Sequence, residues 1–142
     1  MTQLMMPNDA NVAGYVQGGV VLSLVDKIAY ACAARHSGAY CVTASVDRVD
    51  FRSPIKVGHL VTLKGSVNYV GRTSMEVGIK VLAVDPLTGK ETHTNSCYVT
   101  MVAVDAKGRP KPVPQIIPET PEEKRHYREA EDRRRERLTS KT

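Results

Sequence analysis

The sequence predicts an α+β fold in which one central helix is wrapped by a long, curved antiparallel sheet. Three observations support this prediction. Residues 18–36 form a long apolar stretch of helical character, β-rich runs follow it, and short turns with proline or glycine separate these runs. With 142 residues, 42% of them hydrophobic, the chain has the length and composition of one globular domain.

The predicted central helix is GGVVLSLVDKIAYACAARH, residues 18–36. Its apolar residues occupy nearly the whole circumference, which is typical of a buried helix. Ser37 and Gly38 supply a stop, and Arg35 and His36 stand in the last turn, where the helix dipole favours positive charge. Since one sheet cannot cover a helix that is apolar all round, we expect its remaining surface to lie against a second subunit.

Four runs predict the strands of the sheet. They are CVTASVDRVDF (41–51), HLVTLKGSVNYV (59–70), SMEVGIKVLAV (74–84) and ETHTNSCYVTMVAV (91–104). DPLTG joins the last two runs and predicts an antiparallel hairpin. Alternation places Val42, Ala44 and Val46 opposite Thr43, Ser45 and Asp47, and Val61 and Leu63 opposite Thr62 and Lys64. One apolar face therefore needs a cover, and the helix is the element available.

The chain beyond the predicted domain of residues 1–116 is expected to form a linker and a second helix within residues 117–142. The stretch AKGRPKPVPQIIPETP is rich in proline and predicts an extended linker. TPEEKRHYREAEDRRRERL predicts a charged helix in which Thr120 caps the start and Pro121 takes the first position. Because few of its residues are apolar, we expect a solvated or lightly docked helix with i,i+4 ion pairs.

The net charge of +5 is spread unevenly and bears on the partners. From Glu119 onward, eight Lys/Arg against seven Asp/Glu leave only +1, so residues 1–118 carry the remaining +4. A nucleic-acid binder usually concentrates its basic residues on one face with interleaved aromatics. Here one Phe and six Tyr are scattered, so we expect no nucleic-acid partner and favour a small polyphosphate ligand.

Several features predict a cytoplasmic protein. No apolar run has the length of a membrane span, and MTQLMMPND does not resemble a signal peptide, so no membrane partner is expected. Cys32, Cys41 and Cys97 lack the spacing of a metal site, and an odd number of cysteines suits reduced thiols in a cytosol. Small buried side chains are the favoured interpretation of all three.

One carboxylate, Asp26, falls inside the apolar helix. A carboxylate in apolar surroundings must be paired, shifted in pKa, or used in chemistry. Ser23 and Tyr30 share its helix face and neither is cationic. A structural role, bonding to sheet backbone or to a lysine across a subunit interface, is supported equally well by this position alone.

The residues before the helix favour the catalytic alternative. Gly18 and Gly19 stand where the helix begins, so their N–H groups lack helical partners, and without Cβ atoms they admit a ligand closely. The positive end of the helix dipole favours a carbonyl oxygen that is gaining negative charge. With Asn11 in the preceding loop and Asp26 as base or nucleophile, these groups predict a site for attack on a carbonyl.

The pattern N-x-x-G-x-x-x-G-G, followed by Asp seven residues later, resembles the hotdog-fold acyl-CoA thioesterases. Within them it is most similar to the cytosolic acyl-CoA hydrolases and their small bacterial relatives. Four blocks follow that family in order: MPNDANVAGYVQGG, VTASVDRVDFRSPIKVG, YVGRTSMEVGIKV and VAVDAKGRPKPVP. The C-terminal PETPEEKRHYREAEDRRRERL also resembles the tail of many members.

The resemblance implies that two subunits join their sheets and that two active sites lie at their interface. Asn11 and Asp26 occupy the positions of the family's catalytic residues, which a working site takes from opposite subunits. Gly19, with Gly18, would polarise the thioester carbonyl through its N–H group. Trimers of dimers are common in the family, with tetramer and dimer left open here. The reaction would need no metal or organic cofactor, since coenzyme A is part of the substrate.

Coenzyme A is a polyphosphate, which suits the positive body of the chain. The segment GRTSMEV offers Arg72 and the hydroxyls of Thr73 and Ser74 to phosphate, although a solvated turn explains Arg72 equally well. Further candidates for phosphate contact are Lys107, Arg109 and Lys111 in the linker, and Arg52 and Lys56. The rival functions are a non-catalytic acyl-CoA-binding or sensing module, which could dispense with Asp26, and a bare oligomeric scaffold. Acyl-chain length is not predicted.

Overall fold

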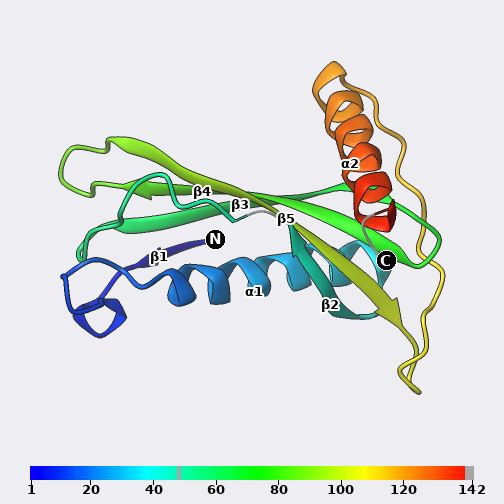
Figure 1. Cartoon of the computed structure of the whole chain (residues 1–142), viewed down its shortest axis with the longest axis horizontal. Coiled ribbons are helices and arrows are strands. Elements are labelled where there is room, and N and C mark those ends of the chain that lie inside the picture. Colours follow the sequence, from blue (N-terminus) through cyan, green and yellow to red (C-terminus); the bar gives the residue numbers. More distant parts are fainter. Residues whose placement is uncertain (48, 140–142) are drawn as a thin grey trace.

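The chain folds around one helix, α1 (Gly18–Ser37), which lies along a five-stranded antiparallel sheet (Figure 1). The computed structural model describes residues 1–47 and 49–139. The sheet order is β1-β3-β4-β5-β2, and the strands are β1 (Thr2–Leu4), β2 (Tyr40–Asp47), β3 (Leu60–Val70), β4 (Ser74–Val84) and β5 (Glu91–Val104). A short 3₁₀ helix, η1 (Pro7–Asp9), precedes α1, and α2 (Pro121–Thr139) follows the sheet. The predicted fold class is confirmed.

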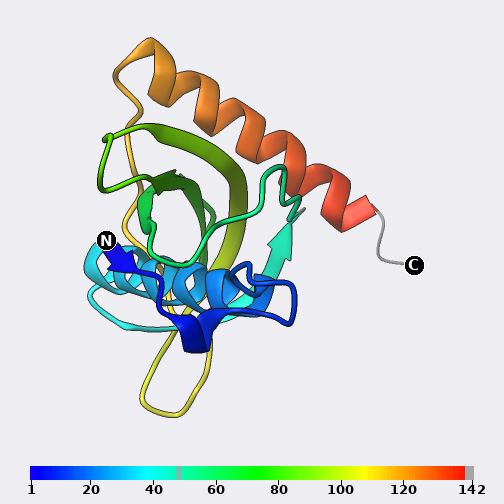
Figure 2. The same cartoon turned by 90° about the vertical axis from the view of Figure 1, so that its left-hand side faces the viewer.

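The two helices lie on opposite sides of the sheet. Seen from the end, the sheet curls around α1, while α2 crosses its outer side (Figure 2). Each of the two helices lies within residues 1–47 and 49–139, and neither combines the length and hydropathy that a membrane crossing requires.

Helix α1 contributes one face to the core. Its buried residues are Val21, Leu24, Val25, Ala29 and Ala33. Gly65 of β3 allows a close approach, because a Cβ there would lie 3.1 Å from Cys32 Sγ on the helix. The helix ends as predicted, with Gly38 in the left-handed region (φ 67°) and its N–H bonded to the carbonyl of Ala34.

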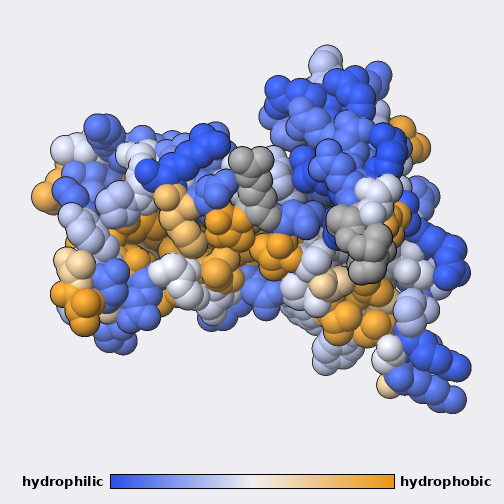
Figure 3. Space-filling model, in the orientation of Figure 1, coloured by the Kyte–Doolittle hydropathy of each residue, from blue (hydrophilic) through white to orange (hydrophobic). Residues whose placement is uncertain are grey.

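The opposite face of α1 is open to solvent in the single chain, where Leu22 and Tyr30 are 37% and 38% exposed. Figure 3 shows a hydrophobic band at the level of α1 and β2, below a largely hydrophilic α2. A helix that is apolar all round is therefore covered on one side only. The surface that we expected to lie against a second subunit is accessible.

Three strands match the predicted runs closely, and two differ. β2 ends at Asp47, so the predicted run 41–51 is too long; residue 48 lies outside the described residues. β1 was not predicted. It has only three residues, too few for a sequence pattern, and it forms because Thr2–Leu4 pairs with the edge of β3.

The alternation predicted for β2 is wrong in the first half of the strand, where Cys41 and Thr43 stand opposite the core residues Ala103 and Met101. A register shift between Thr43 and Ser45 inserts one extra residue, so Thr43 stands opposite Met101 and Val46 opposite Val99. Both of those β5 residues belong to the core. Thr43, not Val42, therefore lies on the side of β2 that faces α1, and after the bulge Val46 returns to that side. Val42, Ala44 and Val46 are all exposed in the single chain.

Helix α2 begins as predicted but docks more firmly than expected. Thr120 Oγ1 accepts the N–H of Glu123, and Pro121 is the first helical residue. The expected local ion pairs are present at Arg125–Glu129 and His126–Glu122. Because both pairs lie within α2, they do not attach the helix to the sheet. Other residues make that contact.

Arg133 anchors α2 to the sheet. Its guanidinium makes two hydrogen bonds, of 3.0 and 2.6 Å, to the carboxylate of Glu76, which is 4% exposed, and it lies 3.6 Å from the ring centroid of Tyr98. Burial by itself would lower the pKa of Arg133, but hydrogen bonding to and attraction by Glu76 outweigh it and raise that pKa. Ala130 is buried, and the expectation of a light docking is wrong because polar and aromatic groups make the contact.

The linker between β5 and α2 is extended, as predicted, but it is bound along its length. Val113 is buried in the core and donates its N–H to the carbonyl of Arg72. His36 Nε2 lies 2.7 Å from the carbonyl oxygen of Pro114, and Gln115 Nε2 donates to the carbonyl of Gly71. The linker therefore ties the end of α1 to the start of β4.

Candidate active site

Asp26 projects from the open face of α1 and is paired with Thr43. Thr43 Oγ1 donates a 2.6 Å hydrogen bond to Asp26 Oδ1. We expected Asp26 to be surrounded by hydrocarbon, and this is wrong for the single chain, in which Asp26 is exposed. Within the single chain its partner is the Thr43 hydroxyl, on the side of β2 that faces the helix. A short bond from a hydroxyl fixes the position of the carboxylate without neutralising it.

The N-terminus of α1 presents free donors. Gln17, the residue before the helix, makes no side-chain hydrogen bond to the first turn, so the N–H groups of Gly18 and Gly19 stay available within the described part of the chain. A Cβ on Gly19 would meet no atom within 4 Å, whereas a Cβ on Gly18 would lie 3.3 Å from Phe51 Cε2. Gly19 is therefore open to a ligand, and Gly18 is partly covered.

Asn11 shapes the loop before the helix. Its Oδ1 accepts the N–H groups of Ala13 (2.9 Å) and Tyr15 (3.2 Å), and its backbone N–H donates to Tyr15 O. The carbonyl end of the amide is thus occupied by the loop, while Nδ2 has no partner among the described residues. Asn11 can therefore act on a ligand as a hydrogen-bond donor.

Geometry separates the donors from the carboxylate of the same chain. Gly19 and Asp26 are seven residues apart on α1, which corresponds to about 10 Å along the helix axis. A thioester carbonyl is far smaller than this distance. Asp26 therefore cannot act on a carbonyl that is bound at Gly19 of its own chain, and one chain alone holds the two halves of a site apart.

Most of the predicted phosphate contacts gather at the other end of α1. Thr73 O accepts the N–H of Ala103, and the carbonyl of Ala103 accepts the N–H of Lys111, so the GRTS turn and the linker are neighbours. Arg72 is exposed there, and Ser74 begins β4. Arg109 is less available than predicted, because its Nε lies 3.4 Å from Asp105 Oδ2. Lys107 is exposed on the same turn.

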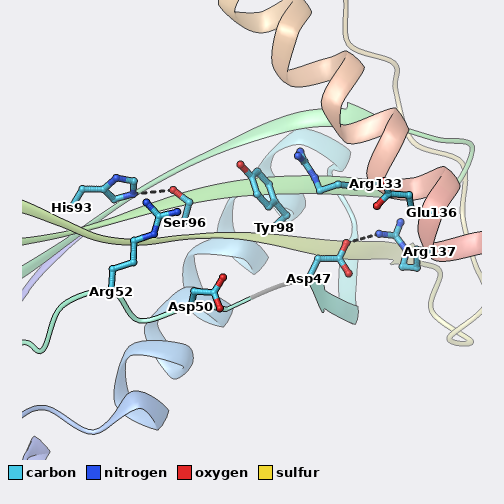
Figure 4. A pocket seen from close by; sticks show the side chains of 9 residues that line it. All are labelled: Asp47, Asp50, Arg52, His93, Ser96, Tyr98, Arg133, Glu136 and Arg137. Atoms are coloured by element: carbon cyan, nitrogen blue, oxygen red, sulfur yellow. Dashed lines mark hydrogen bonds and ion pairs between the residues drawn. The ribbon is translucent and has the colours of Figure 1, made fainter. Parts of the chain in front are cut away.

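Arg52 and Lys56 do not join that group. Lys56 pairs with Tyr15, beside the glycine loop. Arg52 lines a cavity on the outer side of the sheet (Figure 4). The structure thus divides the predicted basic residues between three places.

A wide depression of about 980 Å³ leads from the basic linker toward Asp26. Lys111 and the 105–108 turn form one end of its lining, and Tyr30 and Val42 form the other. Tyr30 lies one helical turn beyond Asp26, and Val42 precedes Thr43 in β2. The lining is largely apolar between these points, which suits an extended ligand arm.

A second cavity, of about 750 Å³, lies on the outer side of the sheet and was not predicted from the sequence. Its lining comes from β5, α2 and the segment after β2: Asp47, Asp50, Arg52, His93, Ser96, Tyr98, Arg133, Glu136 and Arg137 (Figure 4). Two of its arginines bind carboxylates, Arg133 with Glu76 and Arg137 with Asp47 at 2.8 Å. None of Asn11, Gly19 and Asp26 lines it, so it is separate from the candidate active site.

The cysteines have the environment of core residues. Burial raises the pKa of the Cys32 thiol. Burial also raises the pKa of the Cys97 thiol, and the hydrogen bond from Asn95 offsets only part of this increase. Cys41 is 6% exposed. A thiol with a raised pKa is a poor nucleophile at neutral pH, so Cys32 and Cys97 do not compete with Asp26 for a catalytic role.

A central helix wrapped by an antiparallel sheet, with free N–H groups at the helix start and a positioned carboxylate, defines a hotdog-fold thioester hydrolase. The thioesterase superfamily model matches residues 13–90, more than half of the chain. The chain therefore belongs to the thioesterase superfamily. The family and enzyme class predicted from the sequence are confirmed.

Three comparisons illustrate the similarity. Protein VdlD of Helicobacter pylori is 51% identical over 127 residues, which cover 89% of this chain and 72% of VdlD. An apo-hexameric acyl-CoA thioesterase superposes with a TM-score of 0.94 at 47% identity and covers 98% of this chain and 89% of its own. An acyl-CoA hydrolase from Staphylococcus aureus, in complex with butyryl coenzyme A, coenzyme A and coenzyme A disulfide, has a TM-score of 0.88 at 36% identity, with coverage of 99% and 88%.

The Staphylococcus aureus hydrolase also points to a residue that the sequence reasoning missed. Its structures include alanine variants of an asparagine, an aspartate and a threonine. In that chain the aspartate follows the asparagine by 15 positions, and the threonine follows the aspartate by 17. Asn11, Asp26 and Thr43 have the same two intervals. No local motif marked Thr43, because its contact with α1 depends on how β2 pairs with β5 and packs against the helix.

Proposed function

We propose that the protein hydrolyses the thioester bond of acyl-CoA, releasing a fatty acid and free coenzyme A. The observation that carries the proposal is the Asp26 carboxylate, held at 2.6 Å by Thr43 on the open face of α1. The relatives named above as acyl-CoA thioesterase and acyl-CoA hydrolase support the substrate class.

The proposed reaction adds water across the carbonyl carbon–sulfur bond. The carbonyl oxygen binds the N–H of Gly19, whose Cα side is open, and gains negative charge at the positive end of α1. As a base, Asp26 takes a proton from water while the water oxygen attacks, and returns it to the departing thiolate. As a nucleophile, Asp26 attacks the carbonyl and forms an anhydride that water then cleaves. Both routes give the same products, and the geometry is compatible with both.

Asn11 and Thr43 have positioning roles in this proposal. Because the loop occupies Asn11 Oδ1, Nδ2 is the group that can donate to the carbonyl oxygen or the attacking water. Thr43 holds the Asp26 carboxylate from the sheet side. The residue spacing shared with the substituted positions of the Staphylococcus aureus hydrolase supports both assignments.

The site is completed by a second copy of the chain. The axial separation of about 10 Å prevents Gly19 and Asp26 of one chain from acting on one carbonyl. An isologous dimer that covers the open faces of both α1 helices would bring Asp26 of each chain to Gly19 and Asn11 of the other, which creates two equivalent sites. The relative described as hexameric supports a larger assembly, and a trimer of dimers is the arrangement we propose.

Coenzyme A would extend from Asp26 along the depression toward the linker of the same chain. Lys111 lines the end of that depression, and Arg72, Thr73 and Ser74 lie on the neighbouring turn. Their positive charge and hydroxyl groups suit the phosphates. Lys107 and Arg109 lie nearby, although Arg109 must leave Asp105 to take part. The proposed reaction uses no metal or organic cofactor, and a cytoplasmic location remains a prediction.

Release of free thiol from a series of acyl-CoA substrates tests the proposal. We expect the unmodified protein to release thiol. For Asp26→Asn we expect kcat to fall about 10³-fold, because a carboxamide neither accepts the proton nor attacks the carbonyl well. Coenzyme A should still raise the melting temperature of the variant, since binding to the folded state stabilises it. Full activity in Asp26→Asn would refute the assigned role.

The same two measurements separate the rival functions. A non-catalytic acyl-CoA-binding module would show thermal stabilisation by coenzyme A without thiol release. A scaffold would show neither.

A further inference from the structure

Phe51, the single phenylalanine of the chain, lies at the start of α1. Its ring edge is 3.3 Å from the position that a Cβ of Gly18 would take, and the side chain is 45% exposed. The backbone next to it is fixed, because the N–H of Arg52 donates to the carbonyl of Thr94 in β5 at 3.0 Å. A large apolar ring therefore stands beside the free N–H groups and remains half open to solvent.

The ring divides the two glycines by function. It covers the Cα side of Gly18, while nothing lies within 4 Å of the corresponding position on Gly19. The Cα side of Gly19 is thus the more open of the two, with the Phe51 ring beside it. A side chain at position 18 would press against the Phe51 ring, so close packing against the ring is a second reason for a glycine here, besides access for a ligand.

Exposed hydrocarbon continues along the helix from this point. Leu22, which is 37% exposed, lies one turn beyond Gly18 on the same stripe of α1. Two groups adjoin the carbonyl of an acyl-CoA: an acyl chain without polar atoms, and a coenzyme arm with amides. Exposed Phe51 and Leu22 offer no hydrogen-bonding side chain, so they match the acyl chain.

We propose that Phe51 is a specificity-determining residue, whose ring contacts the first carbons of the acyl chain and confines the thioester carbonyl to Gly19. The inference rests on the proposed acyl-CoA hydrolysis and goes beyond it by assigning the acyl side of the site. Hydrocarbon in contact with the ring contributes to binding in proportion to the area that it removes from water.

The test compares unmodified protein, Phe51→Ala and Phe51→Leu on acetyl-, butyryl-, hexanoyl- and octanoyl-CoA. For Phe51→Ala we expect kcat/KM to fall less than about twofold with the acetyl substrate and roughly tenfold or more with hexanoyl-CoA, since each methylene in an apolar pocket carries limited discrimination. Phe51→Leu should retain part of the preference. Leu87→Ala, which removes a fully exposed side chain from the β4–β5 turn, is the control and should leave the profile unchanged.

A second pair of variants tests the contact itself. Gly18→Ala keeps the backbone N–H but pushes on the ring, so it should lower kcat/KM about threefold to tenfold on hexanoyl-CoA. Gly18→Ala combined with Phe51→Ala should be no worse than Phe51→Ala alone, because the added methyl group then has space. Additive losses would overturn the proposed packing.

The outcomes separate this inference from the proposed function. If the unmodified protein releases no thiol from any substrate, both fail. If the unmodified protein is active and Phe51→Ala lowers kcat/KM equally for all substrates, the acyl-contact inference alone is overturned. The same holds if Phe51→Ala changes kcat/KM for none of the substrates while its melting temperature matches that of the Leu87→Ala control.

Discussion

Asp26 depends on a partner 17 residues away in the sequence, and this dependence is specific enough to test. In the proposed reaction, the hydrogen bond from Thr43 Oγ1 orients the Asp26 carboxylate toward the substrate. Thr43→Val keeps the shape of the side chain and removes the donor. We expect kcat to fall about tenfold to a hundredfold, since hydrogen bonds to charged groups contribute about 1.5–3 kcal/mol.

Thr43→Ser is the matched control, because it restores the hydroxyl and loses only a methyl group. It should stay within about threefold of the unmodified protein. Thiol-release kinetics under saturating substrate provide the measurement. Equal losses in Thr43→Val and Thr43→Ser would show that packing, and not the hydroxyl, matters at this position.

Gly19 offers a second test at the residue scale, in which activity and stability should move apart. A methyl group there meets no protein atom but occupies the space where the carbonyl must approach. We expect Gly19→Ala to lower kcat/KM by about tenfold or more. Thermal unfolding should be unchanged or slightly improved, since alanine favours a helix more than glycine does. Unimpaired activity would exclude Gly19 as the site of carbonyl binding.

At the scale of elements, α2 is held by a buried ion pair rather than by an apolar stripe. Arg133→Met would leave the Glu76 carboxylate buried without its partner. We expect the free energy of unfolding to fall by about 3 kcal/mol. Urea unfolding at fixed protein concentration measures this. Arg135→Met is the control, because the Arg135–Asp132 pair is exposed and should contribute less than about 1 kcal/mol.

A double variant distinguishes the ion pair from general packing. Replacing both Glu76 and Arg133 with methionine removes the uncompensated charge, so most of the loss should be recovered. If Arg133→Met matched the Arg135→Met control, the anchoring role of Arg133 would be refuted.

Local patterns predicted the elements whose contacts follow their own periodicity. Helix α1 and strands β3, β4 and β5 carry enough residues to show their period, and Gly38 marked the helix end correctly. β1 has only three residues and forms because it pairs with β3. Local sequence patterns do not show this pairing. Thr43 reaches Asp26 because the start of β2 pairs with β5 so that Cys41 and Thr43 face α1, and the bulge after Thr43 then shifts the alternation of the later side chains.

The site could be predicted in part for the same reason. Gly18, Gly19 and Asp26 stand on one helix, so their relation follows from its geometry. Thr43 and Phe51 reach that helix only through the wrapping of the sheet, and the sequence reasoning assigned neither to the site. The docking of α2 was also underestimated, because Arg133, Glu76 and Tyr98 are far apart in the sequence and polar enough to suggest solvent exposure.

For the whole molecule, the proposed function requires that each active site be shared between two chains. The open face of α1, its exposed apolar residues and the distance of about 10 Å between Gly19 and Asp26 all lead to this requirement. An isologous pair then contains two sites, each with Asp26 from one chain and Asn11 from the other. Two inactive variants should therefore be able to repair one another.

Mixing Asp26→Asn with Asn11→Ala tests this most directly. The two proteins are unfolded together, refolded as a mixture, and assayed for thiol release from acyl-CoA beside each variant refolded alone. Random pairing makes about half of the dimers mixed, and each mixed dimer regains one of its two sites, so activity should return to about a quarter of that of the unmodified protein. A mixture no more active than the better of the two variants alone would contradict a site built from two chains.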